Sequence, residues 1–155
     1  MRLQNKIALV TGAGSGFGRG IATRFAQEGA KVVIADINEQ AAKKVARDIG
    51  DSAIAVVADV SENSDVEAMI QQTVEQWGRL DILVNNAGTT HRNKPMTEVT
   101  EEEFDKIFAV NVKSVFLTAK HGVPLMKKQG HGAILNVAST AGLRPRPGLA
   151  WYNTS

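Results

Sequence analysis

The sequence predicts an α/β fold in which a doubly wound parallel sheet carries helices on both faces. Five short apolar runs rich in β-branched residues alternate with longer segments of helical periodicity, which is the pattern of strand–helix–strand units. The apolar runs are continuous, so both faces of each strand are expected to be covered. The length of 155 residues matches one domain, and we expect residues 1–155 to form a single domain.

The strands are predicted from short apolar runs that stop at polar residues or glycine. In order they are Ile7–Val10, Val32–Ala35, Ala53–Val57, Ile82–Val84 and Ala133–Val137. The second and third strands are followed by Asp36 and Asp59, the fourth by Asn85, and the fifth by Ser139. Because parallel strands run in the same direction, these polar residues all lie on the side of the sheet where the strands have their carboxyl ends.

Helical periodicity and capping signals predict the segments between the strands. The expected helices run from near Gly18 to Gly29, over Ala41–Ile49, from a cap at Ser61 or Ser64 to near Gly78, and onward from Thr100. Thr100 and Glu103 fit a capping box, and Pro124 is expected to kink or end the last turns of that long helix. The Gly/Pro-rich segment 141–155 is predicted to lack a closing element.

Composition excludes several classes of protein. Residues are 43% hydrophobic and 22% charged, which is ordinary for a folded soluble domain. The formal net charge of +2 is too small to predict a nucleic-acid partner. There is no cysteine, the three histidines lack metal-ligand spacing, and no metal site is expected. The start has no signal-peptide pattern and no run is long enough for a membrane helix, so we expect a cytoplasmic protein.

A glycine-rich turn joins the first strand to the first helix. It reads Thr-Gly-x-x-x-Gly-x-Gly, with glycines at Gly12, Gly16 and Gly18. Small residues let a backbone approach a pyrophosphate, and the helix N-terminus provides free N–H groups and a partial positive charge. A tight turn that only packs the helix on the strand is the alternative. The strand before and the helix after favour nucleotide binding.

Asp36 stands at the end of the second strand, where a dinucleotide-binding fold places the residue that binds ribose. A carboxylate there accepts hydrogen bonds from ribose hydroxyls and repels a 2′-phosphate. Neither Ser15 nor Ile37 offers a positive charge to such a phosphate. NAD is therefore preferred over NADP; the alternative for Asp36 is a cap of the next helix.

The motif Asn85-Asn86-Ala87-Gly88 resembles a specific mark of the short-chain dehydrogenase/reductase family. The glycine turn resembles the family's cofactor turn, and Asp59-Val60 its adenine-side pair. Asn111, Ser139 and Tyr152 follow in the family's order. The resemblance covers essentially the whole chain and implies a Rossmann fold. Among bacterial members it is greatest to those called glucose 1-dehydrogenase or 3-oxoacyl-carrier-protein reductase.

The resemblance implies an oxidoreductase that transfers a hydride between NAD(H) and a secondary alcohol or ketone. The implied cofactor contacts are Gly12, Ser15, Gly16, Phe17 and Gly18 at the pyrophosphate, Asp36 at the adenosine ribose, Asp59 and Val60 at the adenine, and Asn86, Ala87 and Gly88 on the nicotinamide side. Tyr152 would be the general acid/base, Ser139 would position the substrate oxygen, and Asn111 would hold a water in the proton relay. The resemblance also implies a homodimer or homotetramer.

The family signature is Tyr-x-x-x-Lys, and the sequence ends at Ser155, one residue before that lysine. In the family the ammonium holds the nicotinamide ribose and helps to deprotonate the tyrosine. We therefore expect an N-terminal part of a longer dehydrogenase, with a sheet incomplete on its C-terminal side. Residues 133–137 would be an uncovered apolar edge, and residues 1–155 alone would have little or no activity.

Two other functions remain open from the sequence. One is a non-catalytic dinucleotide-binding protein that ends at Ser155, and the other is an NADP-dependent 3-oxoacyl reductase. The loops 91–94 and 144–147 are expected to be solvated connections, although Arg144 and Arg146 could attract an anionic substrate. Trp151 is assigned equally to a wall of the substrate site or to a subunit interface, and Trp77 to packing.

Overall fold

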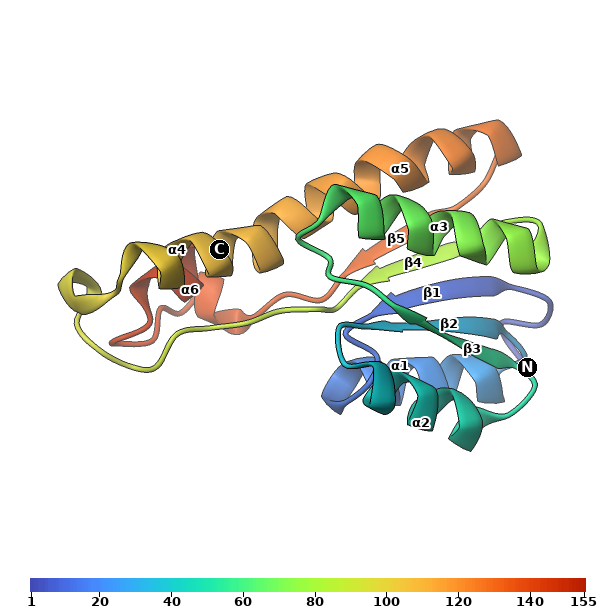
Figure 1. Ribbon diagram of the computed structural model, residues 1–155, viewed down its shortest axis with the longest axis horizontal. Coiled ribbons are helices and arrows are strands. Elements are labelled where there is room, and N and C mark those ends of the chain that lie inside the picture. The colour runs from blue at the N-terminus through green and yellow to red at the C-terminus, as the bar shows by residue number, and fades with distance from the viewer.

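A computed structural model describes residues 1–155 and contains one parallel sheet of five strands in the order β3-β2-β1-β4-β5 (Figure 1). The strands are β1 Ile7–Thr11, β2 Lys31–Asp36, β3 Ala53–Val57, β4 Ile82–Asn85 and β5 Ala133–Asn136. All five predicted strands are confirmed, with ends that differ by at most one residue.

Helices cover both faces of the sheet, as Figure 1 shows. They are α1 Gly16–Gln27, α2 Glu39–Ile49, α3 Asn63–Trp77, α4 Glu101–Phe108, α5 Ser114–Gln129 and α6 Ala150–Thr154, with 3₁₀ turns η1 Met96–Glu98 and η3 Thr140–Gly142 and a π-helix η2 Ala109–Lys113. Alternate residues of each strand face opposite layers: Leu9 packs with α3 and α5, and Val10 with α1 and α2. The doubly wound fold is confirmed.

The strand order reverses at β1. The chain adds β2 and β3 on one side of β1, then returns to place β4 and β5 on the other. In open α/β sheets, ligands bind outside the carboxyl ends of the strands at such a switch point. The turn after β1 and the segment after β4 therefore meet at the position where this fold builds a site.

Two helix starts were predicted from capping residues, with different outcomes. The capping box of α4 is confirmed, because Thr100 Oγ1 accepts from Glu103 N–H and the Glu103 carboxylate accepts from Thr100 N–H. The cap predicted for α3 is wrong: the N-cap position is Glu62, without a side-chain cap. Ser61 lies one residue before the N-cap, and its hydroxyl donates to Asp59 Oδ1 at 2.7 Å in the turn after β3.

The long helix predicted after Thr100 is divided, and of the two expected effects of Pro124, a kink or an end, the end does not occur. The π-helix η2 separates α4 from α5, and α5 continues beyond Pro124 to Gln129. Met126 is 7% exposed and packs in the core with Leu125 beside it. Burial of these side chains outweighs the one backbone hydrogen bond that proline cannot donate.

The C-terminal segment differs from prediction in one respect and agrees in another. Residues 141–155 contain the turn η3 and the helix α6, so the prediction of no closing element is wrong. Two hydrogen bonds between Asn153 and Arg146, and the packing of Trp151 on Phe104, hold α6 in place. The predicted uncovered edge is confirmed, because every residue of β5 is exposed.

A buried carboxylate joins three segments at the amino ends of the strands. Asp81, with a side chain 3% exposed, accepts from Ile7 N–H at 2.7 Å and from Arg79 Nε at 3.0 Å, and His131 Nε2 lies 2.8 Å from it. Burial raises the pKa of Asp81, but these hydrogen bonds outweigh burial and leave that pKa below its ordinary value.

Replacing Asp81 by Asn is expected to lower the free energy of unfolding by about 2 kcal/mol, since hydrogen bonds to a buried charge are lost. A lowered folded-state pKa adds stability that is present above the ordinary pKa of 3.8 and is lost as pH falls through the folded value. Denaturant unfolding against pH should thus show a decline below about pH 4 that Asp81→Asn reduces. Asp48→Asn, in an exposed pair with Lys44, is the control and should change little.

Candidate functional site

The glycine-rich turn after β1 is fixed to the segment after β4 by Thr11 and Asn86. The Thr11 hydroxyl donates to the Val84 carbonyl and accepts from the N–H groups of Asn86 and Ala87 at 3.0 and 3.1 Å. The Asn86 side-chain amide donates to the carbonyls of Thr11 and Gly12 at 2.9 and 3.2 Å. These hydrogen bonds fix the position of the turn relative to the segment after β4.

The three glycines of the motif have different physical roles. A Cβ on Gly18 would lie 2.3 Å from the Gly12 carbonyl oxygen, and one on Gly12 would lie 2.9 Å from the Ala87 Cα atom. These two glycines permit close packing of turn, helix and neighbouring strand. Gly16 instead has open space around it and a φ of +52°, a conformation that favours glycine. Beside it, Ser15 and Phe17 are exposed.

Asp36 lies directly beside this turn. Its Oδ2 accepts from Gly14 N–H at 2.8 Å and its Oδ1 accepts from Asn38 N–H at 2.9 Å. The alternative of Asp36 as a helix cap is wrong, because Asn38 occupies the N-cap of α2 and accepts from Ala41 N–H. A carboxylate has about four acceptor positions, so half-buried Asp36 can accept further hydrogen bonds.

Asp59 and Val60 follow β3 at the same edge of the sheet. Asp59 Oδ1 accepts from the N–H and hydroxyl of Ser61, and Asp59 N–H donates to Asp65. Val60 is 7% exposed. Asp59 thus forms a hydrogen-bonded polar turn, and the apolar side chain of Val60 beside it is buried.

Asn111 lies in the π-helix η2, a type of helix irregularity found frequently at functional sites. Its Oδ1 accepts from Thr89 N–H at 2.8 Å, and its Nδ2 donates to the Thr89 carbonyl and to Ser155 Oγ, both at 2.9 Å. Ser155 Oγ donates in turn to the Tyr152 carbonyl. One amide therefore connects the segment after Gly88 to the helix that carries Tyr152.

Ser139 and Tyr152 lie on the two short helical elements that follow β5. Ser139 is the N-cap of η3, and its Oγ accepts from Ala141 N–H at 3.1 Å. Tyr152 is half-buried in α6, and its phenol makes no hydrogen bond within the chain. In Figure 1, α6 lies beside α4, beyond the carboxyl ends of β4 and β5.

The profile described as "short chain dehydrogenase" matches residues 6–155. The chain belongs to the short-chain dehydrogenase family. This confirms the resemblance inferred from its motifs, and it assigns the chain to a family of oxidoreductases.

Two curated relatives and one solved structure illustrate the relationship. The chain is 48% identical to a 4-formylbenzenesulfonate dehydrogenase of Comamonas testosteroni, over 100% of this chain and 63% of the relative. It is 41% identical to a 2-(R)-hydroxypropyl-CoM dehydrogenase of Xanthobacter autotrophicus, over 97% of this chain and 63% of the relative. A crystal structure of 3-ketoacyl-(acyl-carrier-protein) reductase from Brucella melitensis complexed with NADH superposes with a TM-score of 0.96 at 51% identity, covering 98% of this chain and 64% of that one.

This short-chain dehydrogenase chain thus spans less than two thirds of the length of the relatives it matches. The Brucella melitensis reductase is the protein that holds NADH in that structure. The residues that form the switch-point crevice are those of the glycine turn, the Asn86 segment and the end of β2.

Two residues of this crevice were not singled out from the sequence. Thr11 holds both segments together, and Gly14 leaves room for Asp36, since a Cβ there would lie 2.9 Å from Asp36 Oδ2. Thr11 is the first residue of the glycine motif, so the sequence shows that it lies in the turn. Its hydrogen-bond partners could not be inferred, because they lie 73–76 residues away along the chain. Such pairings follow from the sheet order and not from local pattern.

The loop 91–94 is solvated only in part: Arg92 and Asn93 are exposed, as expected of a connection, whereas His91 is buried. His91 is 6% exposed and its Nδ1 lies 2.7 Å from the Arg92 carbonyl, which requires Nδ1 to carry the proton. Lys94 pairs with Glu103, whose pKa is lowered by the Lys94 ammonium and the Thr100 N–H. Asn93 donates to the Pro147 carbonyl at 2.7 Å. The loop is thereby fixed on both sides.

The two tryptophans pack within the chain. Trp151 Nε1 donates to the Met96 carbonyl at 3.2 Å, and its ring meets the Phe104 ring edge-on at 5.3 Å between centroids. Trp77 packs against the core, as predicted. Trp151 thus joins α6 to α4 and η1.

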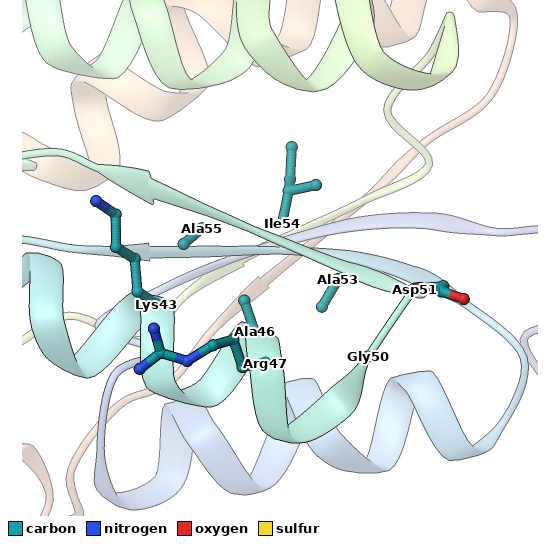
Figure 2. Close-up of a pocket in the computed structure, with 8 residues that line it drawn as sticks. All are labelled: Lys43, Ala46, Arg47, Gly50, Asp51, Ala53, Ile54 and Ala55. Atoms are coloured by element: carbon teal, nitrogen blue, oxygen red, sulfur yellow. The ribbon is translucent and has the colours of Figure 1, made fainter.

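Other surface features lie apart from this crevice. A hollow between α2 and β3, shown in Figure 2, is lined by Lys43, Arg47, Asp51 and small apolar residues, and it contains no predicted site residue. No group of three His, Cys, Asp or Glu side chains is arranged to hold a metal ion. None of the helices combines the length and hydropathy needed to span a bilayer.

Proposed function

We propose that this chain provides the cofactor-binding and catalytic residues of an NAD(H)-dependent dehydrogenase that interconverts a secondary alcohol and a ketone. The observation that carries the proposal is the Asn111 amide, which ties the segment after Gly88 to the helix of Tyr152. This brings the predicted catalytic helix to the strand edge where the glycine turn lies. A binding module has no chemical need for Ser139, Asn111 and Tyr152 together. We also propose a cytoplasmic location, where NAD(H) is available.

The proposed cofactor contacts lie around the switch point of the sheet. Gly12, Ser15, Gly16, Phe17 and Gly18 are proposed to border the pyrophosphate, with free N–H groups of the first turn of α1 directed at it. Asp36 would accept from the adenosine ribose hydroxyls. Asp59 and Val60 would line the adenine, and Asn86, Ala87 and Gly88 the nicotinamide side. Each of these residues lies at the carboxyl end of β1, β2, β3 or β4.

The nicotinamide supplies the hydride chemistry when it is bound. The Tyr152 phenol is proposed to give a proton to the substrate oxygen in reduction and to take it back in oxidation. The Ser139 hydroxyl would donate a hydrogen bond to the same oxygen as negative charge develops there. Asn111 would hold a water that carries the proton onward to solvent.

The expected weakness of residues 1–155 alone follows from Tyr152. Its phenol has no hydrogen-bonded cation within the chain, and an unassisted tyrosine is a poor base near neutral pH. We propose that these residues by themselves turn over little or no substrate. Activity is therefore to be measured on the native protein, with NAD and a panel of secondary alcohols. The absence of NADH formation with every alcohol would favour the non-catalytic alternative.

The NADP-dependent 3-oxoacyl reductase remains the second candidate function. The similarity to a 3-ketoacyl-(acyl-carrier-protein) reductase supports the reaction type, and its description as a complex with NADH favours NAD over NADP for a chain of this kind. Asp36 favours NAD independently, through repulsion of a 2′-phosphate.

Asp36→Asn is expected to reduce the preference for NAD over NADP by about tenfold or more. The substitution removes the negative charge near the ribose but keeps an oxygen that can accept from Gly14 N–H, and tenfold corresponds to about 1.4 kcal/mol. The ratio of kcat/KM for the two cofactors is the measurement. Asp51→Asn, an exposed carboxylate beyond α2, is the control, and an unchanged ratio in Asp36→Asn would argue against Asp36 as the ribose residue.

We also propose that the protein assembles as a homodimer or homotetramer through the outer face of η2 and α5. Phe116 is 64% and Val112 42% exposed there, beside a hollow lined by Phe108 and Ala109. An apolar face that continues over two helical elements is typical of subunit contacts. Phe116→Asp should shift the native protein toward monomer in light scattering. If the mass is unchanged, this face is not the interface.

A further inference from the structure

Positive charge is concentrated on two loops beside the proposed catalytic helix. No Asp or Glu occurs between Asn86 and Thr97 or anywhere from Lys106 to Ser155. Within these segments the loops 91–94 and 144–148 carry Arg92, Lys94, Arg144 and Arg146. Lys94 is neutralised by Glu103, whereas none of the three arginines forms an ion pair.

The two loops form one unit although they are more than fifty residues apart in sequence. Asn93 Nδ2 donates to the Pro147 carbonyl at 2.7 Å, and Lys94 N–H donates to the Gly148 carbonyl at 3.0 Å. Any side chain on Gly148 would collide with Asn93, since a Cβ there would lie 2.0 Å from its Oδ1. The arginines are thus held on a joint surface and not on independent flexible loops.

The backbone of each arginine is anchored to a residue of the site or its neighbour. Arg146 N–H donates to Asn153 Oδ1, and Asn153 Nδ2 donates back to the Arg146 carbonyl, at 3.3 and 3.0 Å. Asn153 directly follows Tyr152. Arg144 N–H donates to the Thr140 carbonyl at 2.8 Å, one residue after Ser139.

The third anchor is the buried imidazole of His91. Its Nδ1–H donates to the carbonyl of Arg92 at 2.7 Å. The ring is 6% exposed, so it serves as a fixed support for the loop and not as a group that faces solvent. The backbone of each of the three arginines is therefore held by hydrogen bonds to residues in or beside the proposed site.

From this arrangement we infer that Arg92, Arg144 and Arg146 form a subsite for an anionic group, a carboxylate or sulfonate, on a small organic substrate. The inference rests on the proposed function for the position of the reacting carbon. Guanidinium groups suit this role because they stay charged and can bind two oxygens of one anion. None of the three guanidinium groups forms an ion pair within the chain, and positive charge that is not paired in this way attracts anions from solution.

The test is calorimetric binding of para-acetylbenzoate to the native protein saturated with NAD⁺, which has no hydride to transfer to this ketone, with the methyl ester as the neutral probe of nearly the same shape. The carboxylate should bind about tenfold more tightly than the ester. Arg92→Gln, Arg144→Gln and Arg146→Gln should each weaken carboxylate binding about three- to tenfold, the range of one hydrogen bond. Ester binding should not change. Raised salt should reduce the difference between probes.

Lys128→Gln, in the last turn of α5, removes the same charge outside these loops and is the matched control. Equal affinity for both probes, or an equal effect of Lys128→Gln, would overturn the inference. The inference would also be overturned if the arginine variants bound the small anion normally and lost binding only to an acidic carrier protein. Binding does not require turnover: arginine-dependent binding in this complex, without consumption of NADH when NADH is supplied instead, supports the subsite and contradicts only the proposed reaction. Unchanged melting temperatures exclude misfolding.

Discussion

Replacing Tyr152 by Phe is expected to lower kcat of the native protein by about 10²–10⁴-fold, the usual contribution of a general acid/base. The substitution removes only the phenol oxygen. It leaves the helix α6 and its contacts intact, because the Tyr152 backbone carbonyl and not its phenol accepts from Ser155 Oγ. Steady-state oxidation of alcohol with NAD, and reduction of ketone with NADH, measure the effect in both directions.

Cofactor binding provides the control for this variant. NADH affinity, measured by the change in its fluorescence, should stay within about twofold of the unmodified protein, since a twofold change is only about 0.4 kcal/mol. Loss of turnover with intact binding would separate chemistry from binding. A variant that retains most of its turnover would assign the proton transfer to another group, and the role proposed for Tyr152 would be withdrawn.

Gly18→Ala is expected to disrupt the cofactor turn. The new Cβ would lie 2.3 Å from the Gly12 carbonyl oxygen and 2.5 Å from the Asn86 amide nitrogen. These two atoms hydrogen-bond to each other and hold the turn to the segment after β4. Overpacking of this kind costs about 1–3 kcal/mol of folding free energy. Because the shifted atoms border the proposed pyrophosphate site, NADH affinity should fall by tenfold or more, about 1.4 kcal/mol.

Gly20→Ala is a matched control in the same helix. Nothing lies within 4 Å of a Cβ placed on Gly20, and alanine stabilises a helix interior by about 0.5–1 kcal/mol over glycine. The melting temperature should therefore stay equal or rise, with NADH affinity unchanged. Similar losses in both variants would mean that helix composition, and not the close approach at Gly18, determines the effect.

The strands and the position of the crevice could be predicted because they depend on local signals. A run such as Val32–Ala35 can be buried only in a sheet with two covered faces, and the residue after it, Asp36, must then lie at the carboxyl edge. The glycine turn, the Asn86 segment and Asp59 follow by the same reasoning. Their joint position at the switch point is dictated by parallel strands and right-handed crossovers.

The parts that could not be predicted depend on contacts between distant residues. Pro124 ends an isolated helix, but the burial of Met126 on the sheet keeps α5 intact. His91 lies in a segment of loop composition and is nevertheless buried, and residues 93 and 94 bond to Pro147 and Gly148. These outcomes depend on residues outside the local window. Ser61 is different, because the carboxylate that accepts from its hydroxyl, Asp59, lies only two residues away.

The helix α6 is an element that was not predicted from the sequence, because contacts outside its own residues hold it in place. The segment around Arg144–Pro147 has turn composition, and reciprocal hydrogen bonds between Arg146 and Asn153 and the edge-on contact of Trp151 with Phe104 hold the helix that follows it. The connection of Asn111 to Ser155 was likewise invisible, since 44 residues separate them. Sequence motifs indicated which residues matter, and the fold indicated how they are connected.

The most direct measurement is a crystal structure of the native protein with NADH bound. The account predicts the pyrophosphate over the turn 12–18, the adenosine ribose hydroxyls within hydrogen-bond distance of Asp36, and the nicotinamide between Gly88 and Tyr152. A dinucleotide bound elsewhere, or a ribose with no contact to Asp36 and a nicotinamide distant from Tyr152, would contradict it.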